Sequence, residues 1–149
     1  MLNQPLDNNV IIKLVVDEQQ LQCTGFDLVF KVVFRTTLHR ALHEWSSVSA
    51  VRFDEVPGRA DIVIGFERGH HEDAFPFDGK GYYSDGRLHF DADEDWSLNS
   101  SQGVNLFQTA VHEIGHLLGL EHSVDPRAVM FAARRPYNPD FTLGECLKC

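Results

Sequence analysis

The chain has 149 residues, of which 43% are hydrophobic, so it is long enough to form one domain with a substantial core. Its 22 acidic and 13 basic residues give a formal net charge of −9, which argues against nucleic acid or an anionic membrane surface as a partner. The apolar runs are too short to cross a membrane. Three cysteines, Cys23, Cys146 and Cys149, make no even disulfide framework, and the final C-x-x-C pair is only a weak indication of metal binding or of a disulfide.

In chain order, residues 10–16 (VIIKLVV) predict a buried strand. Residues 27–46 contain β-branched side chains, yet we expect a helix there. The apolar side chains recur at helical spacing: Phe30, Phe34, Leu38, Ala41, Leu42 and Trp45. Residues 51–56 predict a short strand. The continuous apolar run at residues 60–66 is typical of a parallel strand that is covered on both faces.

A loop rich in glycine, aspartate and histidine follows, and residues 87–93 (RLHFDAD) predict the next strand. The strongest predicted helix covers residues 103–120, with an apolar stripe made of Leu106, Ala110, Ile114, Leu117 and Leu118. Residues 123–141 are proline-rich and irregular. Because strands alternate with helices, we expect a layered α/β or α+β fold, formed by a single domain over residues 1–149.

The sequence HEIGHLLGLEH contains a candidate metal site. His112 and His116 are four residues apart, so on a helix they share one face and can bind one ion. Glu113 can reach the open side of that ion without binding it. Gly119 is expected to end the helix and to return His122 as a third nitrogen ligand. Three neutral imidazoles and one water are the ligands of a catalytic zinc with an open position.

Two simpler interpretations apply to parts of this stretch. An amphipathic helix with histidines on its wet face would explain His112 and His116, but it would not explain a third histidine at this spacing after a glycine. Met130, eight residues after His122, would by itself more often be a core residue. At this position it suggests a methionine floor beneath a zinc ion.

The motif HEIGHLLGLEHSVDPRAVM resembles the zinc motif and Met-turn of the matrixins, the catalytic domains of matrix metalloproteinases. PFDG at residues 76–79 and LHFDADEDW at residues 88–96 are also similar to this family, and the resemblance extends from about Val10 to Phe141. It implies a metzincin-like, twisted, mainly parallel five-stranded sheet with a long first helix and a zinc-binding active-site helix. It also implies a zinc-dependent endopeptidase that acts on proteins or peptides of the extracellular matrix.

In such an enzyme zinc lowers the pKa of its water to about 7, and Glu113 would act as the general base and then as the proton donor to the leaving amine. The resemblance further implies a secreted, monomeric protein. No signal peptide is visible in the first residues. We also expect no propeptide and no hemopexin-like domain in this chain, since the propeptide motif PRCG is absent and Cys23 does not replace it.

The resemblance implies supporting cations as well. Its structural zinc ligands match His71, Asp73 and His89. Its calcium site matches five positions in and after the PFDG motif, whose carboxylate and carbonyl oxygens suit calcium: Asp78, Gly79, Gly81, Asp91 and Glu94. Asp61 matches an acid of a second calcium site. All of these residues also have a simpler interpretation as ordinary loop residues.

The sequence departs from the family pattern in three places. The segment between PFDG and HFD is short, so it lacks a further zinc-binding histidine and part of the edge strand that pairs with substrate; GYY at residues 81–83 is the candidate remnant of that edge. The final helix is expected to be missing. Ala132 and Arg134 replace a proline and an aromatic residue in the substrate-binding wall.

These departures leave two alternatives open beside the endopeptidase. One is a weakened or inactive zinc-binding relative, which the short edge segment and the missing helix would favour. The other is a structural zinc domain, in which a cysteine or histidine would close the fourth position. Intact Glu113 favours the enzyme.

Overall fold

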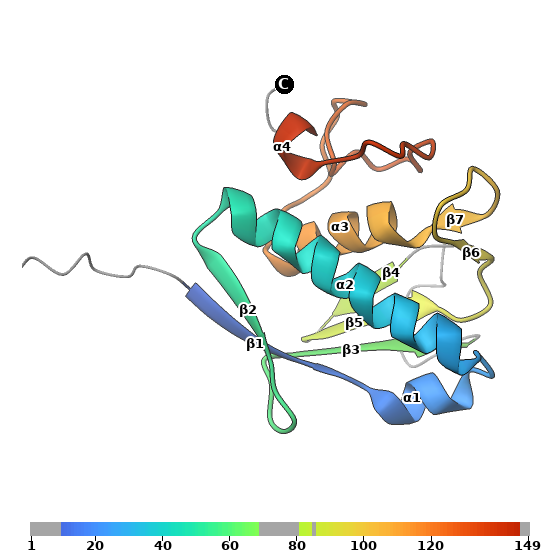
Figure 1. Cartoon of the computed structure of the whole chain (residues 1–149). Helices are drawn as coiled ribbons and strands as arrows, with labels where there is room; N and C mark the ends of the chain where they lie inside the picture. The colour runs from blue at the N-terminus through green and yellow to red at the C-terminus, as the bar shows by residue number, and fades with distance from the viewer. Residues whose placement is uncertain (1–9, 69–80, 85, 147–149) are drawn as a thin grey trace, which may run out of the picture.

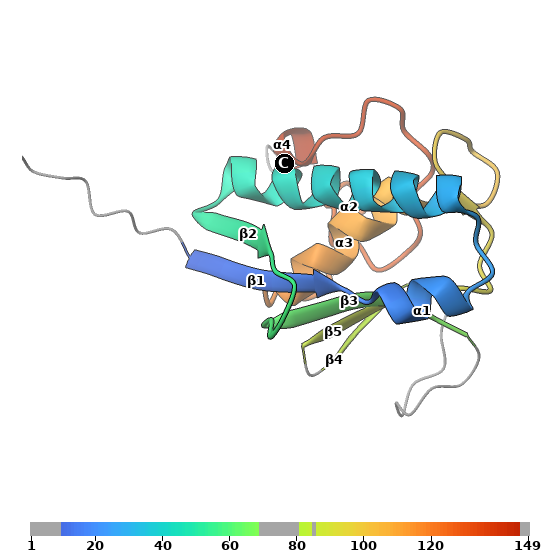
Figure 2. The same cartoon turned by 60° about the horizontal axis from the view of Figure 1, so that its bottom comes forward.

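The computed structural model describes residues 10–68, 81–84 and 86–146 of the chain. Within these residues none of the helices combines the length and the apolar character that crossing a membrane requires. Figures 1 and 2 show a layered arrangement, in which a twisted sheet lies beneath two packed helices. The layered α/β architecture expected from the sequence is therefore confirmed.

The main sheet has five strands in the order β2-β1-β3-β5-β4. These are β1 (Val10–Val16), β2 (Val51–Glu55), β3 (Ile62–Glu67), β4 (Gly81–Ser84) and β5 (Arg87–Asp91). β1 pairs in parallel with both β2 and β3, and β3 pairs in parallel with β5. β4 is antiparallel to β5 and lies at the edge of the sheet, so the prediction of a mainly parallel, five-stranded sheet is correct.

Two helices cover one face of this sheet, as both views show. α2 (Leu28–Val48) is the long first helix predicted from the apolar spacing, and α3 (Leu106–Leu117) carries the histidine motif. A short helix, α1 (Glu18–Cys23), was not predicted, because six residues are too few to display a helical period. A small two-stranded sheet, β6 (Trp96–Ser97) with β7 (Val104–Asn105), precedes α3.

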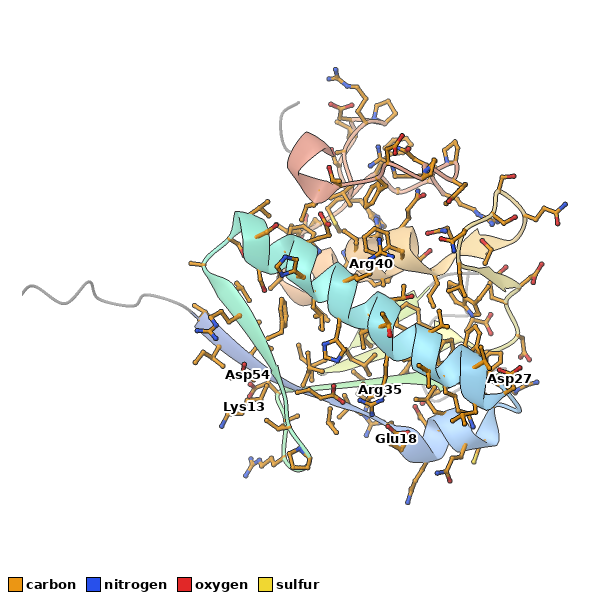
Figure 3. All side chains as sticks on the ribbon, viewed as in Figure 1. Lys13, Glu18, Asp27, Arg35, Arg40 and Asp54 are labelled. Atoms are coloured by element: carbon orange, nitrogen blue, oxygen red, sulfur yellow. The ribbon has the colours of Figure 1, made fainter. Side chains whose placement is uncertain are left out.

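Local side chains determine where α2 begins and how it is held. Asp27 is its N-cap, and Oδ1 accepts a hydrogen bond of 2.7 Å from the Phe30 amide. Arg35 on α2 reaches Glu18 of α1, as Figure 3 shows, and also Glu55 of β2. These charged contacts join three consecutive elements of the chain, although exposed ion pairs of this kind add little to stability.

The core lies between the sheet and these helices. Phe34 of α2 packs edge-on against Phe66 of β3, with a ring-centroid distance of 4.7 Å, and against Phe90 of β5 at 5.7 Å. All three side chains are at most 2% exposed, and each is expected to contribute about 1.5–3 kcal/mol by burial. The indole of Trp45 on α2 donates a 2.8 Å hydrogen bond to the Val111 carbonyl of α3, which aligns the two helices.

The described part of the chain ends in one helical turn, α4 (Leu143–Cys146). The sequence led us to expect that the final helix is missing, and the described residues form only this turn of four residues there. Leu143 is fully buried, and its amide donates a 2.9 Å hydrogen bond to Glu44 Oε2 of α2. The turn forms because Leu143 adds to the core and the Glu44 carboxylate satisfies an amide at the start of the helix.

Candidate metal centre

Helix α3 positions the predicted metal ligands. Its N-cap is Asn105, whose Oδ1 accepts a 2.9 Å hydrogen bond from the Gln108 amide. The helix ends at Leu117, and Gly119 follows with φ of +85°. This left-handed conformation suits glycine, so the expectation that Gly119 ends the helix is confirmed. The chain then turns back and returns His122 towards the helix.

The turn brings the three histidines together. His116 Nε2 lies 3.1 Å from His112 Nε2 and 3.2 Å from His122 Nε2. Four ligands arranged tetrahedrally at zinc–nitrogen distances of 2.0–2.1 Å would be about 3.3 Å apart. The ring nitrogens therefore have the spacing that one shared zinc ion requires. Among the residues that the structure describes, no other group of three or more potential ligand side chains converges in this way.

The opposite ring nitrogens settle the tautomers of two of these histidines. His112 Nδ1 lies 2.8 Å from the Val129 carbonyl, and His116 Nδ1 lies 2.8 Å from the Leu120 carbonyl. A carbonyl oxygen can only accept, so each Nδ1 carries the proton and each Nε2 has a lone pair. Two lone pairs facing each other at 3.1 Å repel, and a cation between them would remove that repulsion. The donor set thus fits a zinc ion, with backbone carbonyls orienting the ligands.

The environment of His116 also favours the neutral, metal-binding form. Burial lowers the pKa of His116, although the bond to the Leu120 carbonyl opposes this, and the nearby charge of His122 lowers it further. A neutral imidazole is the form that binds zinc.

Met130, which the sequence predicts as a floor beneath the metal ion, packs against the helix that carries two of the histidines. Its side chain is 5% exposed and packs against Gly115 in the last turn of α3. A Cβ atom at Gly115 would overlap the Met130 sulfur and would lie 3.0 Å from Trp45 Cζ2. Glycine therefore allows the close approach of the methionine to the helix, which sequence reasoning did not identify. A glycine in the interior of a strongly helical pattern was the available signal.

Glu113 is 3% exposed and lines a pocket together with His112. It does not belong to the converging ligand set, which consists of the three histidines alone.

The same pocket contains the two predicted substrate-binding residues, Ala132 and Arg134. Gln108 is a further residue that the sequence did not reveal. Its Nε2 donates a 3.0 Å hydrogen bond to the Pro136 carbonyl, and its Oε1 accepts a 2.8 Å bond from the Asn138 amide. This buried side chain holds the wall of the pocket against α3. A glutamine on the buried side of an amphipathic helix was the signal.

The candidate structural zinc residues are only partly described. His71 and Asp73 lie outside the described residues. His89 is 6% exposed, and its Nε2 lies 3.4 Å from Glu67 Oε1. Side chains alternate along a strand, so His89 and Glu67 face away from the aromatic core, where Gln20 of α1 donates a 2.8 Å hydrogen bond to Glu67 Oε1. His89 therefore has a carboxylate neighbour in this structure.

The candidate calcium residues are also divided. Asp78 and Gly79 lie outside the described residues. Gly81 pairs with Phe90 across β4 and β5, which places it beside Asp91, and the Glu94 amide donates a 3.3 Å bond to the Asp91 carbonyl. Three of the five predicted residues thus lie at one end of the β4–β5 pair. Asp61, predicted for a second site, lies elsewhere, and its Oδ2 accepts a 2.8 Å bond from the Lys13 amide.

Comparison with known proteins agrees with this fold and site. The family model described as Matrixin matches residues 26–145. Human stromelysin-3 is 44% identical over 109 residues, which cover 66% of this chain and 22% of that protein. Human matrilysin is 45% identical over 103 residues, covering 62% and 39%. Karilysin of Tannerella forsythia is 46% identical over 103 residues, covering 58% and 21%.

The match extends over most of the chain, and it includes the long helix, strands β2 to β5 of the main sheet and the three converging histidines. The chain therefore belongs to the matrixin family. It spans only about a fifth to two fifths of the length of the relatives named above.

Proposed function

We propose that this chain is a zinc-dependent endopeptidase in which His112, His116 and His122 hold the metal ion and Glu113 acts as the general base. The observation that carries the proposal is the convergence of three imidazole nitrogens within bonding range of one ion, with their tautomers set by carbonyls. Family membership supports it. Zinc at a site of this type supplies Lewis-acid chemistry, because it acidifies water and polarises a carbonyl group.

Residues of this chain would transfer the proton, bind a substrate side chain and position the peptide. Glu113 accepts a proton from the attacking water and returns it to the nitrogen of the leaving amine. The pocket that Glu113 and His112 line would receive a side chain beside the scissile bond. β4 lies at the sheet edge and against α3, so a substrate peptide would add to it as a further strand. In this way the edge strand would position the peptide carbonyl beside the metal centre.

Other parts of the proposal rest on the family. They are a structural zinc at His71, Asp73 and His89, and calcium at Asp78, Gly79, Gly81, Asp91 and Glu94, with Asp61 in a second calcium site. A buried His89 and the grouping of Gly81, Asp91 and Glu94 support them. We further propose that the protein is secreted and monomeric, that residues 1–149 form a single domain, and that its substrates are proteins or peptides of the extracellular matrix.

A weakened or inactive relative of the matrixins is the second candidate. The observation that favours it is the short edge strand, since β4 has only four residues and offers a substrate few backbone hydrogen bonds. The third class, a structural zinc domain, would need a fourth protein ligand.

One experiment separates the three. The zinc-loaded chain is incubated with a mixed peptide pool, and products are identified by mass spectrometry; the same preparation is titrated with a peptide hydroxamate. An endopeptidase cleaves peptides and binds the hydroxamate with one-to-one stoichiometry. The inactive relative binds the hydroxamate and cleaves nothing. A structural zinc domain does neither, and that result would contradict the proposal most directly.

A further inference from the structure

The pocket beside Glu113 continues away from the histidines into a second hollow. The neighbouring hollow is lined by Ser100, Ser101 and Tyr137 among others. Asn105, Arg134 and Arg135 line both cavities, whereas His112 and Glu113 line only the first. The two arginines therefore mark the end of the pocket that is farther from the metal ligands.

Arg134 and Arg135 lie in the segment after α3 that forms one wall of the pocket. Hydrogen bonds hold this segment at both ends. At its start, the Ser123 amide donates a 2.8 Å hydrogen bond to the Met130 carbonyl. At its end, Gln108 holds Pro136 and Asn138 through its two side-chain groups. Arg134 thus belongs to an anchored segment, which fixes the position of its backbone beside the pocket.

The two guanidinium groups differ in their partners. Arg135 donates a 2.7 Å hydrogen bond to the Arg127 carbonyl, and its guanidinium lies 5.7 Å from the Phe141 ring centroid. Arg134, in contrast, makes no hydrogen bond or ion pair with any residue that the structure describes. In a chain with a net charge of −9, an arginine that lines a pocket and makes no such bond is well placed to bind an anion.

The rest of the lining limits what that anion can be. Next to the metal ligands the pocket is largely apolar, with Val104, Val129 and Phe131. A ligand that fits both parts has an aliphatic stem near α3 and a carboxylate at its far end. A glutamate side chain has this form, and guanidinium and carboxylate groups pair in a planar, two-bonded geometry. Glu113 lines the pocket but not the second hollow, so its charge should oppose a carboxylate at the shared end less than Arg134 attracts it.

We propose that this chain selects substrates with an acidic side chain, preferably glutamate, next to the scissile bond, and that Arg134 is the residue that recognises it. The inference rests on the proposed endopeptidase function for its substrate, but the binding preference of the pocket does not depend on turnover. Arg134 then acts in substrate specificity rather than in the chemical step, since its guanidinium pairs with the substrate side chain.

The test uses pairs of peptides in which glutamate and glutamine are exchanged, in turn, at each position flanking the cleaved bond. The zinc-loaded parent chain should cleave the glutamate peptide with a kcat/KM roughly five-fold higher at one position, a ratio typical of a partly exposed charged pair. Arg134→Gln should reduce the ratio to about one, and Arg134→Glu should favour lysine at that position. Arg59→Gln, an equal change of charge at an exposed residue in the β2–β3 connection, should keep the parental ratio.

A second measurement keeps this inference separate from the proposed function. Two peptide hydroxamates that differ only by glutamate against glutamine are titrated into the zinc-loaded chain. The parent should bind the glutamate form more tightly, and Arg134→Gln should not. If nothing is cleaved but this preference holds, the endopeptidase function fails and the recognition by Arg134 stands. If the parent shows no preference for glutamate, or Arg134→Gln retains it in full, the recognition by Arg134 is wrong.

Discussion

The metal centre on α3 and the predicted calcium region at the end of β5 depend on the fold in different ways. The three histidines come from eleven consecutive residues, and one helix, one glycine turn and two carbonyls bring them together. The calcium residues come from two strands and the loops beside them, so strand pairing must first align Gly81 with the end of β5. The first site is therefore encoded locally, and the second requires the finished sheet.

Replacing a metal ligand should have the largest effect of all. His112→Ala, His116→Ala or His122→Ala should abolish stoichiometric, tight zinc binding at neutral pH, because two imidazoles hold the ion far more weakly than three. Zinc content is measured after gel filtration. His43→Ala, which changes an exposed histidine of α2, is the matched control and should keep the parental content. Unchanged zinc in all three ligand variants would show that the metal lies elsewhere.

Glu113→Ala tests the chemistry at the same centre without removing a ligand. We expect zinc content to stay at the parental level, since Glu113 is outside the converging set. Peptide turnover should fall by about 10² to 10⁴ or more, because the attacking water loses its proton acceptor and the amine its donor. Zinc content and kcat are measured on one preparation. Equal turnover by parent and variant would remove Glu113 from the mechanism.

The difference between the two regions also explains which elements and site residues could be predicted from the sequence. Apolar periodicity and runs of β-branched residues predicted α2, α3 and the parallel strands, and the spacing around Gly119 predicted the metal centre. α1 was missed because it is too short for a period, and Gln108 and Gly115 were missed because their roles depend on contacts with distant residues. Gln108 contacts Pro136 and Asn138, and Gly115 contacts Met130 and Trp45. No local pattern reports such pairings.

A larger side chain at Gly115 should disturb the packing of α3 against Met130 and Trp45. Gly115→Ala places a methyl group into the Met130 sulfur and close to Trp45. Overpacking of this kind should lower the free energy of unfolding by roughly 1–3 kcal/mol, even though alanine favours a helix. Gly144→Ala in α4, where nothing lies within 4 Å of the added Cβ, is the control and should be neutral or slightly stabilising. Urea unfolding measures both, and equal behaviour would mean that Met130 moves aside freely.

The smallest expected effect concerns the region that depends on the finished sheet. If calcium binds only the native state at Gly81, Asp91 and Glu94, a tenfold excess over its Kd should stabilise the zinc-loaded chain by about 1.4 kcal/mol, and Tm should rise by a few degrees. Asp91→Ala should flatten this rise. Its Oδ1 also accepts a 2.8 Å bond from the Asp93 amide, so the variant starts from a lower Tm, and the slopes with calcium must be compared rather than the absolute values.

Asp54→Ala is the control for this comparison, because it removes an exposed carboxylate from β2, at the opposite edge of the sheet. It should keep the full response to calcium. A parental Tm that does not change with calcium would contradict the site, and an equal rise in Asp91→Ala would place the ion at other oxygens. A response that depends on Asp91 but leaves zinc content unchanged would mean that the two regions bind their ions independently. The locally encoded centre would then remain loaded while the calcium region is empty.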